Sequence, residues 1–433
     1  MEALLEEVTE VLGRLIRFKT VNPPGNEREA QQWLAGYLED AGLTVELEGP
    51  EPERQSLVAR LPGKADGPVL GYLGHMDTVL ADPGAWSRDP WDGGVHDGFL
   101  WGRGALDMKD QVAAEAVALA HLARTGARPE RGEVRLFCVA DEEVGGALGA
   151  KWLTEQRPDL ARCDYLLNEG AGAVMPYGNR RLYGVCVAEK GTFRFRVVAE
   201  GRAGHASIPE IADNALPKLA PVLERLGRDE LPFDVVAEPR LLLSSLGLDP
   251  DDPKAALEAI RGIEPRLAEL MGPTLRVTVA PTMITASEKI NVIPARAELR
   301  VDCRVPPGME GDEVMTRIRE AVGEAPGLHV EFLEQVVGNR SAVDTPLMRA
   351  IDGWVRGIDP AGEAVPVVLP AFTDSRWWRH AFPDCIAYGF MPQRHQTLYE
   401  AWPLIHGADE RIDVRDLALA AGFFARLPST LLA

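Results

Sequence analysis

Histidine and carboxylate side chains follow several apolar segments of this sequence, at positions where they could bind metal ions. The first motif is GHMDT (residues 74–78), which comes directly after the apolar run 69–73. Because side chains alternate along a strand, His75 and Asp77 are expected to lie on the same side. The imidazole could then bind a metal ion while the Asp77 carboxylate accepts a hydrogen bond from its other nitrogen, which would fix the tautomer.

Carboxylates follow other segments in the same way. Asp107 ends the segment GRGALD, just before an expected helix, and Glu169 follows the apolar stretch 165–167. The acidic run DEE (141–143), which contains Glu142 and Glu143, follows the apolar stretch 134–139. Adjacent carboxylates repel one another, and bound cations would relieve that repulsion. A late histidine, His406 in IHGADE, adds a further imidazole.

Each of these motifs has an ordinary structural explanation when it is taken alone. Asp107 could be a helix N-cap, the acidic run could be a solvated turn, and His75 could simply end a strand. The set is more specific than its members, because imidazole and carboxylate together suit zinc and a shared carboxylate suits a pair of metal ions. The combination therefore favours a metal centre.

The elements that must position these residues alternate between helix and strand patterns in the first part of the chain. Strands are expected at 56–61, 69–73, 134–139 and 165–167, and an alanine-rich helix at 112–122. Nearly continuous apolar strands suit a sheet that is covered on both faces, and functional groups gather at the carboxyl ends of such strands. This part is predicted to be a doubly wound α/β domain.

The pattern changes near Lys190 to alternating, half-buried strands around 193–197, 275–279 and 297–301, with a helix at 214–226 and an acidic, proline-punctuated stretch at 228–270. Buried runs return at 365–369 and 386–390. The predicted fold class is therefore α/β, with a doubly wound mixed-sheet catalytic domain (1–189 and 306–433) and a smaller inserted α+β lid domain (190–305).

Composition narrows the class of protein further. The chain has 433 residues, of which 46% are hydrophobic, so a packed two-domain protein is expected rather than a disordered one. A net charge of -20 disfavours a nucleic-acid partner. The 5 scattered cysteines contain no CxxC pair, which argues against a disulfide framework and a thiolate metal site. Without a secretion signal or an apolar membrane-spanning run, a cytoplasmic protein is expected.

Taken in order, the motifs resemble those of the aminoacylase, carboxypeptidase S and glutamate carboxypeptidase family of co-catalytic zinc hydrolases. GHMDT, GRGALDMKD, DEEVGG, NEG and IHGADE match its metal-site motifs. GRAGHAS, NVIP and DCRVPPG match its inserted domain, and TDSRWWR matches a substrate-binding turn. The resemblance spans nearly the whole chain and implies a metallopeptidase or metal-dependent amidohydrolase.

The resemblance also implies a ligand set for two divalent metal ions. His75, Asp107 and Glu169 would hold one ion. Asp107, Glu143 and His406 would hold the other, with Asp107 bridging the pair. Zinc is the expected metal, and cobalt and manganese accept similar ligands.

Catalytic and substrate-binding roles follow from the same resemblance. Glu142 would be the general base, Asp77 would orient His75, and His205 would help to stabilise the oxyanion, in some relatives from across a dimer. Substrate contacts would come from four further residues, namely Asn291, Arg304, Thr373 and Gly389. Arg304 is expected to pair with the substrate carboxylate.

The leading hypothesis is hydrolysis, by metal-activated water, of an amide bond in N-acyl amino acids or C-terminal dipeptides, small substrates that carry a free carboxylate. A biosynthetic deacylase for acetylornithine or succinyl-diaminopimelate is the alternative within enzymes. A non-catalytic binding protein on the same fold is disfavoured, because all five ligands, Glu142 and Asp77 are present. A homodimer through the inserted domain stays open, since the long stretch 228–270 departs from the simplest members of the family.

Overall fold

The computed structural model describes residues 2–228, 231–323 and 327–433. The chain divides into two units: residues 1–187, 341–367 and 373–433 form the first, and residues 188–340 and 368–372 form the second. The described residues do not include 229–230 of the acidic stretch. They also do not include residues 1 and 324–326 of the expected catalytic domain.

The first unit contains a mixed sheet whose inner strands are parallel, and the predicted fold class is confirmed. β6 pairs with β3, β3 with β7, and β7 with β19 in parallel, whereas β1 and β2 add an antiparallel edge. β8, β9 and β18 extend the sheet beyond β19. In sheet order the strands are β1 (Thr44–Glu48), β2 (Ser56–Pro62), β6 (Glu133–Val139), β3 (Val69–His75), β7 (Tyr165–Asn168), β19 (Ile386–Gly389) and β9 (Arg180–Glu189), with β8 (Val174–Tyr177) and β18 (Gly362–Leu369) both pairing β9.

Helices pack against both faces of this sheet. On one face the Tyr72 hydroxyl of β3 donates a hydrogen bond to the Phe424 carbonyl of α14 (2.7 Å). On the other face Leu73 joins a buried cluster with Trp378 of α12. Burial on both faces explains why β3 is an almost continuous apolar run. The packed helices are α1 (Glu2–Arg17), α3 (Lys109–Thr125) and α14 (Val414–Leu431), which contact one another, and α4 (Ala150–Gln156) and α12 (Ser375–Ala381), which also contact each other.

The parallel strands bring the predicted metal-binding motifs to one edge of the sheet. His75 is the last residue of β3, Glu169 comes directly after β7, and the short 3₁₀ turn η2 (Glu142–Val144) follows β6. Because β6, β3 and β7 are neighbours that run in the same direction, their carboxyl ends lie side by side. The polar residues that follow these apolar strands therefore lie together at one edge of the sheet.

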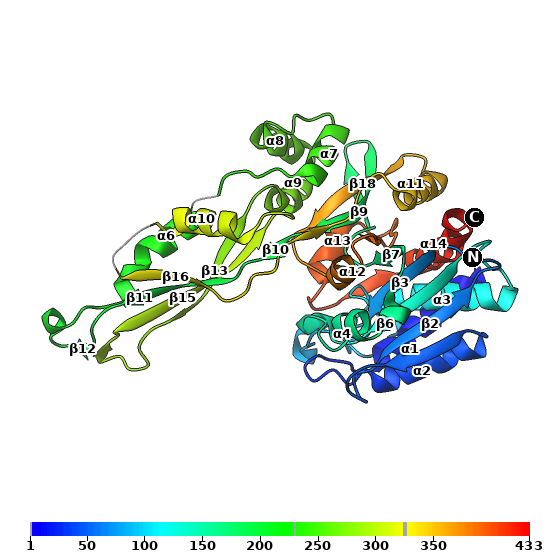
Figure 1. Cartoon of the computed structure of the whole chain (residues 1–433), viewed down its shortest axis with the longest axis horizontal. Helices are drawn as coiled ribbons and strands as arrows, with labels where there is room; N and C mark the ends of the chain where they lie inside the picture. The colour runs from blue at the N-terminus through cyan, green and yellow to red at the C-terminus, as the bar shows by residue number, and fades with distance from the viewer. Residues whose placement is uncertain (1, 229–230, 324–326) are drawn as a thin grey trace. The chain divides into compact units, whose positions relative to one another are not determined.

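The second unit is built on antiparallel strands that run along two helices, as Figure 1 shows in green and yellow. β15 pairs with β10, β11 and β13, and β16 pairs with the other side of β11. Phe195, Val197 and Ala199 of β11 are buried in the core, Val198 between them is also buried, and Arg196 and Glu200 are more exposed. The elements are β10 (Gly191–Thr192), β11 (Phe195–Glu200), β13 (Thr278–Thr285), β15 (Arg296–Val305), β16 (Leu328–Phe332), α6 (Ala220–Arg228) and α10 (Gly311–Val322).

The second unit extends further along the chain than the expected boundary at residue 305. β16 completes its sheet, and Val314, Ile318 and Val322 of α10 join the core that β11 and β15 supply. The unit therefore continues to residue 340. The sequence carried a signal for this strand, because Leu328, Val330 and Phe332 alternate with His329 and Glu331.

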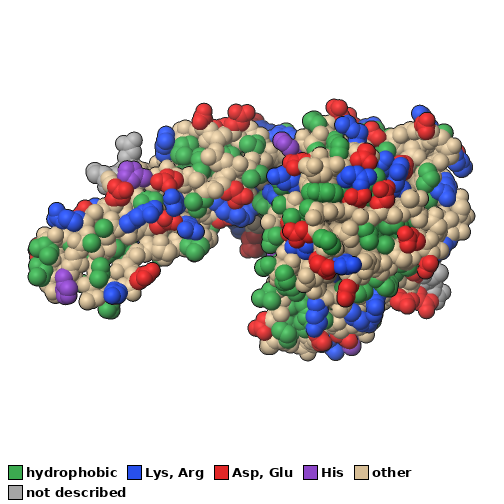
Figure 2. All heavy atoms as spheres, turned by 60° about the horizontal axis from the view of Figure 1, so that its bottom comes forward, with side chains coloured by type: hydrophobic (Ala, Val, Ile, Leu, Met, Phe, Trp, Pro, Cys, Tyr) green, Lys and Arg blue, Asp and Glu red, His purple; other side chains and the backbone are tan. Residues whose placement is uncertain are grey.

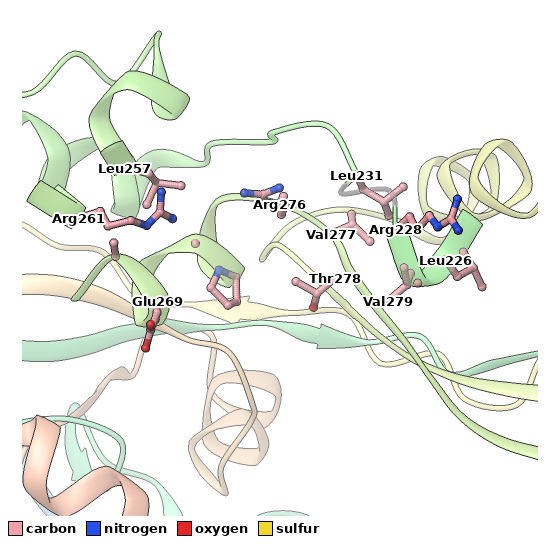
Figure 3. A pocket seen from close by; sticks show the side chains of 14 residues that line it. Leu226, Arg228, Leu231, Leu257, Arg261, Glu269, Arg276, Val277, Thr278 and Val279 are labelled. Carbon is pink, nitrogen blue, oxygen red and sulfur yellow. The ribbon is translucent and has the colours of Figure 1, made fainter. Parts of the chain in front are cut away.

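The stretch 228–270 contributes helical segments to the second unit and borders a cavity of about 330 Å³ (Figure 3). Three arginines, Arg228, Arg261 and Arg276, line this cavity together with aliphatic side chains. None of the predicted site residues is among the residues that line it. The helices are α7 (Ala237–Ser245), α8 (Pro253–Ile263) and α9 (Pro265–Met271).

Charged side chains of both signs are interspersed over the face of the molecule drawn in Figure 2. The net charge of -20 is therefore not gathered into one acidic patch on that face. Among the helices that the structure describes, none combines the length and apolar character needed to cross a membrane.

Candidate metal centre

Five imidazole and carboxylate groups gather at the carboxyl edge of the first unit's sheet. His75, Asp107 and Glu169 form one group, and Asp107, Glu143 and His406 form the other. Within each group, one potential ligand atom from every residue lies within 4.8 Å of the others. Asp107 belongs to both groups, which is the division that the family resemblance implied.

Asp107 faces a histidine with each of its two oxygens. Its Oδ1 lies 3.1 Å from His75 Nε2, and its Oδ2 lies 3.0 Å from His406 Nε2. Glu143 Oε2 is 3.3 Å from His406 Nε2, and Glu169 Oε1 is 3.9 Å from His75 Nε2. A carboxylate with one oxygen in each group is the arrangement that lets a single side chain bridge two cations.

The pKa shifts in the cluster are those expected of a site that lacks enough positive charge to balance its carboxylates. Burial raises the pKa of Glu143, and it raises the pKa of Glu169 well above its usual value, with Asp107 adding to that second effect. Burial also opposes ionisation of Asp107, but hydrogen bonds from His406 and His75 outweigh it and lower the Asp107 pKa. The same pairing raises the pKa of His406 to about 10. This donor set of carboxylates and imidazoles fits divalent cations, which would supply the missing charge.

Asp77 supports the cluster in a different way from the one expected. Its buried carboxylate accepts hydrogen bonds from the backbone N–H groups of Glu142 (3.2 Å) and Glu143 (3.1 Å) and from Asn22 Nδ2 (2.8 Å). The predicted acceptor for His75 Nδ1 was this carboxylate, but its Oδ1 lies 3.6 Å away, whereas the backbone carbonyl of Asp77 lies at 2.9 Å. The carboxylate thus fixes the Glu142–Glu143 turn, and the carbonyl orients the imidazole.

Glu142 and Glu143 have different partners although they are adjacent in sequence. Glu143 accepts a hydrogen bond from the Val79 N–H with Oε1 and contacts His406 with Oε2. Glu142 Oε2 lies 4.0 Å from His75 Nε2 and is not in either ligand group. Burial and the nearby Glu169 raise the Glu142 pKa well above its usual value. The turn therefore directs the two carboxylates to different partners, Glu143 to His406 and Glu142 toward His75.

Glu410 holds the loop that carries Asp107, a role that the sequence analysis missed. Its fully buried carboxylate accepts hydrogen bonds at Oε1 from the backbone N–H groups of Gly104 (3.1 Å), Leu106 (2.7 Å) and Asp107 (3.1 Å). Arg103 Nη1 donates to its Oε2 (2.6 Å). Burial raises the pKa of Glu410 to about 7, although Arg103 opposes this shift.

Strand pairing explains how this late segment reaches an early loop. β20 (Arg411–Asp413) pairs antiparallel with β5 (Phe99–Trp101). Glu410 immediately precedes β20, and Arg103 follows β5, so the pairing brings them together. Arg103 Nη2 also donates to the Gly407 carbonyl (2.9 Å), next to His406. Both residues belong to quoted motifs, GRGALD and IHGADE, so the sequence did contain a signal for them.

The TDSRWWR segment contacts the turn that carries Glu169, through Thr373 and Ser375. Asn168, which precedes Glu169, donates from Nδ2 to Thr373 Oγ1 (3.0 Å) and to Ser375 Oγ (3.1 Å). Thr373 is buried, and its hydroxyl oxygen accepts this bond next to Glu169, while its expected contact with substrate stays a prediction. Arg376 donates to the Gly145 carbonyl (2.8 Å) at the end of the Glu142 turn.

Gly389 lies at a close approach between two segments of the chain, and its expected contact with substrate stays a prediction. A Cβ atom at this residue would lie 1.9 Å from the Glu169 carbonyl oxygen. Only glycine therefore fits between the end of β19 and the turn that carries the ligand Glu169.

The remaining predicted residues belong to the second unit. His205 is exposed on β12 (Gly204–His205), which pairs with β14 (Val292–Ile293), and the N–H of the next residue donates to the Asn291 carbonyl (3.1 Å). His205 and Asn291 thus lie in neighbouring segments. Arg304 on β15 is partly buried and donates from Nε to Asp302 Oδ1 (2.8 Å).

Comparisons with known proteins identify what the chain is similar to. The model of "Peptidase family M20/M25/M40" matches residues 71–430, which confirms the family resemblance seen in the motifs. A succinyl-diaminopimelate desuccinylase of Methylorubrum extorquens (strain PA1) is 28% identical over 427 residues, covering 95% of this chain and 96% of that protein. A probable carboxypeptidase S-like 2 of Dictyostelium discoideum is 24% identical and covers 83% of this chain and 71% of that protein.

A solved structure shares the fold over the whole length. The M20 family metallo-carboxypeptidase Sso-CP2 from Sulfolobus solfataricus superposes with a TM-score of 0.73 at 17% identity, covering 98% of this chain and 99% of that chain.

Proposed function

Because the chain belongs to peptidase family M20/M25/M40, we propose that it hydrolyses the amide bond of N-acyl amino acids or C-terminal dipeptides at a two-metal centre. The observation that carries the proposal is the pair of ligand groups that share Asp107, with Glu142 beside them. A non-catalytic binding protein would not need Glu142, a partly buried carboxylate outside both ligand groups, next to a complete donor set.

The proposed cations are held by His75, Asp107 and Glu169 on one side and by Asp107, Glu143 and His406 on the other. Divalent ions bound there supply a Lewis acid that polarises the scissile carbonyl and makes water a nucleophile near neutral pH. We propose zinc because the donors are imidazole and carboxylate, and cobalt or manganese are the alternatives.

Glu142 is proposed as the general base and then the general acid. Its carboxylate takes the proton from the attacking water and delivers it to the nitrogen of the leaving amine, so one residue serves both halves of the reaction. Asp77 supports this step, because its carboxylate accepts the backbone N–H groups of Glu142 and Glu143 and so sets the direction of the turn.

Substrate binding is proposed to involve Asn291, Arg304 and His205 of the second unit. Arg304 would pair with the free carboxylate of the substrate, and its bond to Asp302 would keep the guanidinium in place for that purpose. His205 would donate a hydrogen bond to the oxyanion. These roles follow the family motifs GRAGHAS, NVIP and DCRVPPG.

The test is a substrate and metal panel. Metal-free protein is supplied separately with zinc, cobalt and manganese, and the hydrolysis of N-acyl amino acids, dipeptides and their carboxamide analogues is measured. We expect metal-dependent cleavage of substrates with a free carboxylate. Turnover that is unchanged in the metal-free protein would contradict the proposal.

A desuccinylase is the second candidate, and the similarity to the desuccinylase of Methylorubrum extorquens favours it. N-succinyl-diaminopimelate and N-acetylornithine therefore belong in the panel. The chain would be assigned to this second function if its kcat/KM for either compound were about 100-fold higher than its kcat/KM for every simple N-acyl amino acid and dipeptide. Such a ratio corresponds to roughly 2.7 kcal/mol of transition-state preference.

A further inference from the structure

Cys163 and Cys385 are 222 residues apart in sequence, yet their sulfur atoms lie 3.7 Å apart in the first unit. Both side chains are buried. The sequence alone treats all five cysteines as separate, inert thiols because they are scattered and odd in number. The fold brings these two together, so they form a dithiol that spacing along the chain could not reveal.

The two cysteines lie on neighbouring segments of the backbone, close enough for their sulfur atoms to meet. β7 and β19 are parallel neighbours with Tyr165 opposite Ile386, and Cys163 comes two residues before Tyr165 whereas Cys385 comes one residue before Ile386, so the pair is offset by one residue. The Ile386 N–H donates to the Asp164 carbonyl (2.9 Å), which holds the two chain segments together. Neighbouring strands are about 4.8 Å apart, and disulfides span Cα separations of about 4.4–6.8 Å. The sulfurs need to approach by about 1.7 Å, which rotation of the side chains can supply.

The dithiol is also within reach of small solutes. Cys163 and Cys385 both line a cavity of about 570 Å³, together with polar residues such as Arg135, Arg162 and Asp384. The other three cysteines, Cys138, Cys186 and Cys303, are not among the residues that line it. A small polar oxidant can therefore meet this pair, which distinguishes it from the remaining thiols.

We propose that Cys163 and Cys385 are a modification site that hydrogen peroxide, or another small hydroperoxide, converts into a reversible disulfide. One sulfur attacks a peroxide oxygen, the O–O bond breaks, and a sulfenic acid forms while the hydroxide released takes up the thiol proton as water. The second sulfur then attacks the sulfenic sulfur, the S–S bond forms, and the S–O bond breaks with loss of a second water. The two sulfurs together lose two electrons, and the peroxide is reduced to two waters.

The position of the bond determines its consequence. It would join the starts of β7 and β19, whereas Glu169 and Gly389 lie at the opposite ends of the same strands. The oxidised chain should therefore resist unfolding, because a cross-link between distant residues restricts the unfolded state. The metal-ligand turn itself is left in place. The proposal does not depend on the substrate that the enzyme cleaves.

The reaction is expected to be slow. Burial, and then the neighbouring Cys385, raise the pKa of the Cys163 thiol well above its usual range, so little thiolate is present. The disulfide is consequently a response to sustained exposure to peroxide, and the test must allow hours rather than seconds.

The experiment treats the metal-loaded full chain with excess hydrogen peroxide, blocks the remaining thiols and digests the protein with trypsin. The two cysteines lie in separate tryptic peptides, 163–180 and 380–394, and neither peptide contains another cysteine. We expect a cross-linked pair with a mass about 2 Da below the sum of the two peptides, lost after treatment with dithiothreitol. We also expect a thermal midpoint about 3 °C or more higher, reversed by the same reductant.

Cys163→Ser and Cys385→Ser should lose the shift in thermal midpoint, whereas Cys186→Ser, at a buried cysteine on β9, should keep it. The peptide measurement uses the wild-type chain and so holds even if a serine variant fails to fold. Recovery of the two peptides only as reduced thiols, or as sulfinic and sulfonic acids, would overturn the proposal. So would a cross-link that forms equally between other pairs of cysteines.

Discussion

At the scale of single residues, Glu142 and Glu143 differ in their partners, as expected if Glu142 is the proposed base and Glu143 a proposed ligand. Glu143 contacts His406, whereas Glu142 belongs to neither ligand group. Glu142→Gln should therefore retain both metal ions and lose turnover by about 10²–10⁴-fold, the usual contribution of a general base. Metal content by mass spectrometry and kcat on the best panel substrate check this.

The matched variant is Glu143→Gln on the same turn. It removes a charged ligand, so the second ion should be lost together with activity. High turnover in a fully metallated Glu142→Gln protein would refute the assignment of the base.

Glu410 acts on the metal centre without touching a metal ion. It holds three backbone N–H groups of the loop that ends at Asp107. Glu410→Ala should free this loop and weaken metal binding by about 10–100-fold, the range seen when support for a ligand is removed. Competition with a chelator measures the affinity. Glu410→Gln keeps an acceptor oxygen and should show a smaller loss, and equal losses in the two variants would mean that the charge pair with Arg103 matters more than the loop bonds.

At the scale of elements, the sequence predicts the strand ends well because their signals are local. An apolar run followed by His75, or by the acidic turn, marks both the strand and the polar residues at its carboxyl end. The residue types and their order then suffice to match a known family. Which oxygen of Asp107 faces which histidine is not a local property, because it depends on the pairing of β20 with β5.

The supporting contacts could not be predicted for the same reason. Glu410 reaches Arg103 across 307 residues, and Asn168 reaches Thr373 across 205. A single residue in a motif does not reveal whether its polar atom points to a ligand or to a neighbouring backbone. The motif alone does not reveal that the Thr373 hydroxyl contacts Asn168, and the expected contact of Thr373 with substrate stays a prediction.

Lys190 gives the second unit a dependence of stability on pH. It lies at the start of this unit, and its buried Nζ donates to the carbonyls of Pro273 (2.7 Å) and Arg276 (2.8 Å) and to Thr278 Oγ1 (3.2 Å). Burial lowers the pKa of Lys190 to about 7, with Arg304 and Arg276 adding to the effect and Asp302 opposing it. The unfolded value is about 10.4.

Between these two values the unfolded chain binds a proton that the folded chain does not. The free energy of unfolding should therefore rise with pH from about 7 to 10, by about 3–4 kcal/mol from this residue alone. Urea unfolding of the wild type and of Lys190→Met at both pH values isolates this contribution, because other titrating groups cancel in the difference. If the difference in free energy of unfolding between the wild type and Lys190→Met is the same at pH 7 and at pH 10, burial does not lower the pKa of Lys190.

At the scale of the whole molecule, the second unit carries Arg304, the residue proposed to bind the substrate carboxylate. Arg304→Ala should lower kcat/KM by about 10²-fold or more for substrates with a free carboxylate, because the charge would lose its partner in a desolvated site. Carboxamide analogues should be affected by less than about 10-fold. Arg300→Ala is the matched control, since Arg300 lies on the same strand and likewise pairs with a carboxylate, that of Glu298 (2.8 Å). Similar losses for both substrate types would make Arg304 a structural residue.

The distribution of the ligands along the chain has a consequence for biosynthesis. All three donors of the first group, His75, Asp107 and Glu169, precede the second unit in sequence, whereas the second group needs His406. During translation, donors for one cation have emerged long before the ribosome reaches the residue that completes the other site. In the proposed centre, a chain that lacked His406 would therefore keep every donor of the first group and lose one donor of the second.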